Sequence, residues 1–146
     1  MYPNVKRFSE SLSMAEKFFS SPVVMDAIED IVEMQAEVLL FSQYAEYASI
    51  EDQKKNLQLL RRLQSKQKNM CFRCILSDDP DAKALLEEVL KHFEAYGHHV
   101  NRDDPMAVFA EVEASLDDLE ESLAFHDRFG YFPDEETGGE TPPYQL

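Results

Sequence analysis

Residues 109–126 read FAEVEASLDDLEESLAFH and carry the most regular apolar repeat in the chain. The repeat recurs every three or four residues, at Phe109, Val112, Leu116, Leu119, Leu123 and His126. This spacing is the period of one buried face of an α-helix. The stretch therefore predicts a long amphipathic helix over residues 105–127 with a coiled-coil-like seam.

Helix starts are marked along the whole chain by polar capping residues. A cap followed by proline occurs at Ser21-Pro22, Asp79-Pro80 and Asp104-Pro105, and proline suits the first helical position. Ser49 and Asp52 resemble a capping box with Asp in the place of Glu or Gln. Together with the apolar spacing, these signals predict three further helices, at 22–48, 50–75 and 80–96. We expect Gly97 to end the helix over 80–96 in a left-handed conformation.

The predicted fold class is all-α, because no segment alternates apolar and polar residues between hairpin turns. We expect four long helices in an antiparallel bundle or a hairpin pair, with a short N-terminal helix and an extended C-terminal tail. The short connection at Ser49 favours a hairpin of the first two helices. A chain of 146 residues suits one domain. We place a helical bundle domain at 1–129 and an acidic Gly/Pro-rich tail at 130–146.

The charge balance limits the classes of function. The chain has 14 Lys and Arg against 29 Asp and Glu, a formal net charge of -15. Such a surface is repelled by phosphate backbones and by anionic membranes, which disfavours nucleic acid as a partner. The chain has only two cysteines and neither a signal-peptide pattern nor an apolar run of membrane-spanning length. These features predict a cytoplasmic protein without a membrane span.

Charge is concentrated in one segment, because residues 53–76 carry seven basic side chains and no acidic one. This basic helix can pack beside acidic helices of its own domain or of a second copy. Alternatively, an exposed stripe of it can dock an acidic protein surface, or more weakly RNA, for which the usual recognition features are missing. The candidate partner-binding residues are Lys54, Lys55, Arg61, Arg62 and Lys68.

Aromatic residues in the predicted tail form a second candidate surface. Tyr131, Phe132 and Tyr144 lie beside prolines in an otherwise acidic segment. Such rings can anchor a tail in a partner groove or on a second subunit. The alternative is a tail that is simply solvated.

A metal site is a further hypothesis, since Cys71 and Cys74 form a C-x-x-C pair and His98 and His99 follow in a polar loop. Zinc takes four such ligands in tetrahedral geometry. However, the cysteines fall inside a predicted helix, where burial in the core is the commoner role of a free cysteine. The chain also lacks the short motifs of nucleotide binding, hydrolysis and di-iron chemistry. We therefore expect no enzymatic activity and no cofactor.

Several packing and capping landmarks are shared with a known family. They are the Phe18-Phe19-x-Ser21-x-x-Val24 run, Tyr44, the Leu76-Ser77-x-Asp79 junction, Tyr96-Gly97, and Met106-x-x-Phe109 followed by Leu116 and Leu119. With these landmarks, residues 18–124 resemble an uncharacterised all-helical family found mainly in cyanobacteria and described as a domain of unknown function. The resemblance implies an all-helical fold. The family has no assigned activity and no assigned catalytic residues, so the resemblance carries none over to this chain.

Taken together, the sequence predicts a non-enzymatic interaction protein: an adaptor, assembly factor or regulator. We expect it to self-associate and to bind another protein or a larger complex through its charge-segregated helices and its tail. One alternative is an acidic nucleic-acid mimic that inhibits a nucleic-acid-binding enzyme. The other is a metal-dependent regulatory protein using Cys71 and Cys74.

Overall fold

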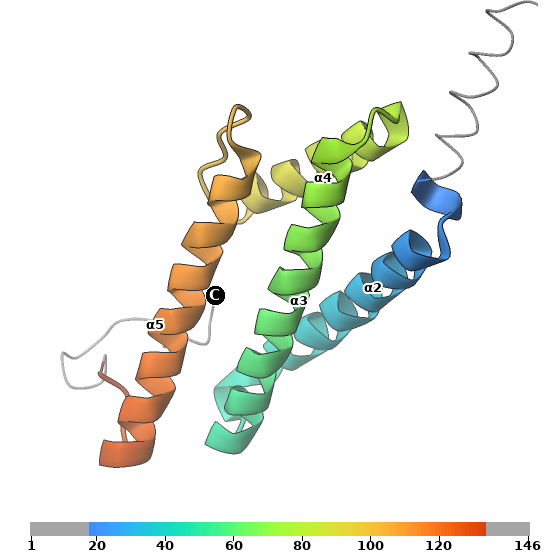
Figure 1. The fold of residues 1–146 in the computed structure, drawn as a ribbon. Helices are drawn as coiled ribbons and strands as arrows, with labels where there is room; N and C mark the ends of the chain where they lie inside the picture. Colours follow the sequence, from blue (N-terminus) through green and yellow to red (C-terminus); the bar gives the residue numbers. More distant parts are fainter. Residues whose placement is uncertain (1–17, 134–146) are drawn as a thin grey trace, which may run out of the picture. The chain divides into compact units, whose positions relative to one another are not determined.

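The computed structural model describes residues 18–133 and shows helices without any strand over that range. Four long helices follow one another along the chain (Figure 1): α2 (Pro22–Ser42), α3 (Ile50–Leu76), α4 (Pro80–Ala95) and α5 (Val108–Phe129). Short 3-10 helices, η1 (Ala45–Tyr47) and η2 (Pro105–Ala107), precede α3 and α5. The all-α prediction is confirmed. Residues 18–20 are helical, but the residues before them, where the short N-terminal helix is predicted, and most of the predicted tail lie outside the described residues.

Local capping bonds explain where the helices start. The Ser49 hydroxyl accepts a hydrogen bond from the backbone N–H of Asp52 at 3.1 Å, as expected of a residue capping α3. The Asp79 carboxylate accepts from the N–H of Asp81 at 2.9 Å, and Pro80 takes the first position of α4. Gly97 has φ +90°, which confirms its left-handed conformation after α4.

Two predicted boundaries are wrong by several residues. The first long helix ends at Ser42 rather than at residue 48. The Ser42 hydroxyl donates to the carbonyl of Leu39 at 2.6 Å, and the chain then tightens into 3-10 geometry before η1. The last helix starts at Val108, because Pro105–Ala107 forms the 3-10 helix η2. It continues to Phe129, where Gly130 with φ +81° follows.

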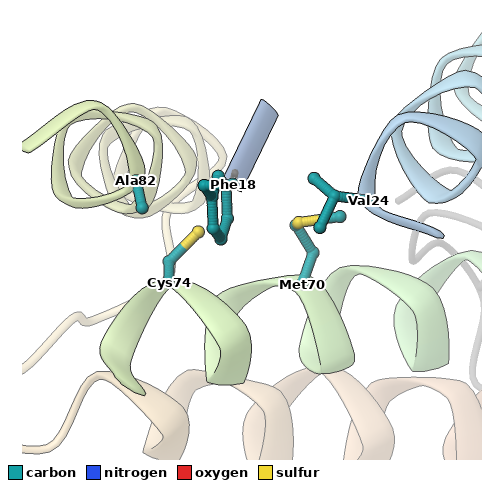
Figure 2. Packing of buried hydrophobic residues seen from close by; sticks show 5 residues of the cluster. All are labelled: Phe18, Val24, Met70, Cys74 and Ala82. Atoms are coloured by element: carbon teal, nitrogen blue, oxygen red, sulfur yellow. The ribbon is translucent and has the colours of Figure 1, made fainter. Parts of the chain in front are cut away.

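The helices contribute to two compact units, which divide α2 and α3 between them. Unit 1 contains residues 18–31 and 66–108, and unit 2 contains residues 32–65 and 109–133. In unit 1 the core is a cluster of Phe18, Val24, Met70, Cys74 and Ala82. Figure 2 shows the Met70 side chain directed at Val24 and the Cys74 sulfur beside the Phe18 ring. Lys66 of α3 donates to Asp30 of α2 at 3.0 Å, whereas Met70, later in α3, meets Val24, earlier in α2 (Figure 2). These two helices therefore run antiparallel here, as the predicted hairpin requires.

In unit 2 the core forms between α3 and α5. Its buried members are Leu57, Leu116, Leu119, Leu123 and Phe132. The leucines of α5 belong to the repeat that predicted this helix, and all are at most 3% exposed. The two helices run antiparallel (Figure 1), because residues early in α3 meet residues late in α5. Lys54, early in α3, pairs with Asp127, late in α5, whereas the side chain of Gln64, further along α3, donates to the carbonyl of Phe109 at the start of α5 at 3.0 Å.

Replacing Leu119 by alanine should destabilise unit 2 by about 2–5 kcal/mol, because it leaves a cavity in a core that buries this side chain almost completely. Leu39→Ala is the matched control, since Leu39 is 63% exposed and its truncation should change stability by about 0.5 kcal/mol or less. Urea unfolding followed by circular dichroism measures both. Equal losses for the two variants would contradict this assignment of the core.

Candidate protein interface

The basic helix α3 directs part of its charge toward α5 within unit 2. The Arg61 guanidinium donates to Asp117 and to Glu120, each at 2.8 Å. Two turns earlier, Lys54 pairs with Asp127 and more distantly with Glu51. Hydrogen bonding to Asp117 raises the pKa of Arg61, and hydrogen bonding to Asp127 raises the pKa of Lys54. Both cations, predicted to bind a partner, are thus engaged by their own chain.

The other candidate cations of α3 are placed differently. Lys55 and Arg62 are exposed in unit 2 and form no ion pair within the described residues. They lie seven residues apart, so they fall on one side of the helix, rotated away from Lys54 and Arg61. Lys68, in unit 1, is also exposed and without an ion pair among residues 18–133. The predicted basic residues therefore fall into two groups. Lys54 and Arg61 pair with α5, whereas Lys55, Arg62 and Lys68 are exposed.

Exposed apolar residues on α2 were not anticipated from the sequence. In unit 2, Val32, Leu39 and Leu40 are each more than half exposed, and Ala36 between them is exposed as well. We call these four residues the outer face of α2. The opposite side of the same segment carries the buried Phe41 and the half-buried Val38. The signal in the sequence was that the segment of α2 has apolar residues on more than one side of the helix.

The predicted aromatic surface is only partly exposed. Phe132 is buried and packs in the core cluster of unit 2, so the expectation of a partner-binding ring at this position is corrected. The turn at Gly130 brings this ring back onto α3 and α5. Tyr131 is exposed and lies edge-on to Phe125 with ring centroids 5.5 Å apart. Tyr144 lies outside the described residues.

A cavity of about 310 Å³ opens between α3 and α5 in unit 2. Leu57, Leu123 and Ala124 supply apolar lining, and the Lys54–Asp127 ion pair lies at its edge. Since the two charges bind each other, the cavity presents no unpaired charge from this pair to a ligand. Lys55 also lines the cavity, so the cavity adjoins one of the exposed cations of unit 2.

The two cysteines belong to the interior of unit 1. Cys71 and Cys74 are both 1% exposed and are free thiols. Burial raises the pKa of Cys71 to about 12 and that of Cys74 to about 11, which keeps both thiols protonated at neutral pH. A protonated thiol is a poor metal ligand and a poor nucleophile. The interpretation as core cysteines therefore has structural support.

The predicted histidine ligands lie in the loop after α4. His98 is half-buried against Phe93, with ring centroids 5.9 Å apart, and His99 is exposed. Arg102 ties this loop to α4 by donating to Glu87 and Glu94, each at 2.8 Å, which lowers the pKa of both carboxyls. Within residues 18–133, no three His, Cys, Asp or Glu side chains gather in a way that could hold a metal ion.

None of the helices described here combines the length and the apolar character needed to cross a membrane. Comparison with protein-family models, with characterised proteins and with solved structures found no match. The resemblance to an all-helical family of unknown function therefore stays a prediction.

In the folded protein, both thiols should react very slowly with a disulfide reagent at pH 8, because burial keeps them protonated and out of contact with the reagent. Urea should accelerate the reaction as the protein unfolds. Since folding raises both pKa values above the usual value of 9.0, the native state holds more protons at high pH. Stability should consequently fall as the pH rises above about 9.

The control for the pH effect is Cys71→Ala/Cys74→Ala, which should flatten that part of the stability profile. Rapid labelling of both thiols in the native protein at pH 8 would contradict the buried, protonated assignment.

Proposed function

We propose that this chain is a non-enzymatic cytoplasmic interaction protein, an adaptor, assembly factor or regulator that binds another protein or a larger complex. One observation carries the proposal. Lys55 and Arg62 of α3 are exposed in unit 2 and form no ion pair among the described residues, whereas the adjacent cations Lys54 and Arg61 pair with acidic side chains of α5. In a chain with a net charge of -15, these cations are suited to an acidic surface of a second molecule. A second copy of this acidic chain is one molecule of that kind, so the proposal includes self-association.

The pair Arg61 and Arg62 separates internal from external roles, because adjacent arginines of the same helix face different surroundings. Arg61→Glu places a third carboxylate beside Asp117 and Glu120, and should destabilise the protein by about 1–2 kcal/mol. Arg62→Glu should leave stability within about 0.5 kcal/mol. It should nevertheless reduce binding of the partner or of a second copy by about tenfold.

Tagged full-length protein captured from a mild lysate at two salt concentrations measures partner binding, and light scattering of the pure protein measures self-association. Binding through Lys55 and Arg62 should weaken at high salt. Lys55→Glu serves as an independent second variant, because Lys55 lies on the same side of α3. If capture and oligomeric state are the same for wild type, Arg62→Glu and Lys55→Glu, the proposed role of this surface is wrong.

The acidic nucleic-acid mimic has one observation in its favour. The acidic side chains Glu111, Asp118 and Glu121 share one side of α5, are exposed and form no ion pair among the described residues. A row of carboxylates on a helix can occupy a basic groove that otherwise binds phosphates. This function predicts that Asp118→Lys/Glu121→Lys abolishes capture of a nucleic-acid-binding enzyme and that excess double-stranded DNA displaces it. Capture that survives both treatments would exclude the mimic.

A further inference from the structure

The outer face of α2 is an apolar surface without a cover in the described part of unit 2. Val32 is 57% exposed, Leu39 63% and Leu40 60%. Spacings of four, seven and eight residues from Val32 place Ala36, Leu39 and Leu40 on one side of the helix. Contiguous exposed apolar residues of this kind commonly mark a protein-binding site. Here the surface is a helix face of about two turns.

Carboxylates accompany this face along the same helix. Glu33 and Glu37 are exposed, lie one turn apart, and have no cationic partner among residues 18–133. Like charges at this spacing destabilise a helix slightly, so an external cation would relieve them. Moreover, residues 18–53 contain eight acidic residues and no Lys or Arg. The charged residues that surround the outer face in the sequence are therefore all negative.

The charge decides between the possible occupants. A second copy docked face to face through the same surface would bring its own Glu33 and Glu37, from another chain of net charge -15, to the interface. An acidic or neutral helix would leave these carboxylates without partners. An amphipathic helix with lysines or arginines beside its apolar stripe satisfies both features, since apolar residues cover Val32, Leu39 and Leu40 while cations meet the glutamates.

We propose that the outer face of α2 docks a basic amphipathic helix of another protein. This inference rests on the proposed function as an interaction protein and specifies a surface and a partner chemistry for it. The binding mode is a helix laid along a helix face, with the apolar stripe providing affinity and the flanking charges providing orientation and partner choice. The surface is distinct from Lys55 and Arg62 of α3, which suit an acidic partner.

The test uses the full chain and a labelled synthetic peptide of leucine and lysine whose leucines form one helix face. Fluorescence anisotropy should show binding that weakens with salt. Leu39→Ser/Leu40→Ser should weaken binding by about tenfold or more, because it removes the apolar contact while both positions are exposed. Glu33→Gln/Glu37→Gln should weaken binding by about tenfold and reduce its salt dependence.

The matched control is Asp118→Asn/Glu121→Gln, which removes the same charge from exposed, unpaired positions of α5 in the same unit. It should alter binding by about twofold or less, since it changes only the general attraction between opposite charges. A scrambled peptide of the same composition should bind weakly, because its leucines no longer share one face. Circular dichroism should show unchanged helix content in all variants.

Four results would overturn the proposal. The first is that the wild type does not bind the peptide, and the second is that Leu39→Ser/Leu40→Ser binds it as well as the wild type does. The third is that the α2 and α5 charge variants lose the same amount of affinity for the peptide. The fourth is that the wild type is a dimer and Leu39→Ser/Leu40→Ser is a monomer. The last result would assign the face to a second copy. Failure here combined with salt-sensitive, Arg62-dependent capture of a partner would leave the proposed function standing and remove only this surface.

Discussion

The core of unit 2 depends on one register between α3 and α5, and Arg61 is a side chain that fits that register. Its guanidinium reaches Asp117 and Glu120, which lie three residues apart on α5 and so face the same neighbour. The carboxylates are more than half exposed, so the ion pairs themselves contribute about 1 kcal/mol or less. Their main effect is to favour one alignment of α3 with α5, because a shifted alignment would break both the Arg61 ion pairs and the Lys54–Asp127 pair. Leu57 then meets the leucines of α5.

The sequence predicted the helix starts well because they depend on local chemistry. The bonds made by Ser49 and Asp79 join residues two or three positions apart, and proline at the first helical position needs no distant partner. The end of α2 was mispredicted because apolar periodicity continues past Ser42. There, a side-chain bond to Leu39 and the burial of Phe41 and Ala45 outweigh the periodic signal. Such a balance is decided by packing, which a single sequence does not display.

The candidate surface was predictable only in outline. The sequence identifies α3 as basic, but Lys54 and Lys55, or Arg61 and Arg62, are chemically equivalent neighbours. A rotation of about 100° along the helix makes one internal and the other external, and only the position of α5 reveals which is which. The outer face of α2 was missed for a related reason. A helix with apolar residues on several sides offers more than one candidate interior face, and periodicity alone chooses one.

The turn at Gly130 also has a consequence for limited proteolysis. Because the chain reverses there and returns Phe132 to the core of unit 2, this residue is part of the packing even though it follows the end of α5. A cut between Gly130 and Phe132 would remove a ring that covers Leu57 and the leucines of α5, whereas a cut beyond Pro133 would spare it. The folded unit therefore includes the ring of Phe132, which lies beyond the end of α5.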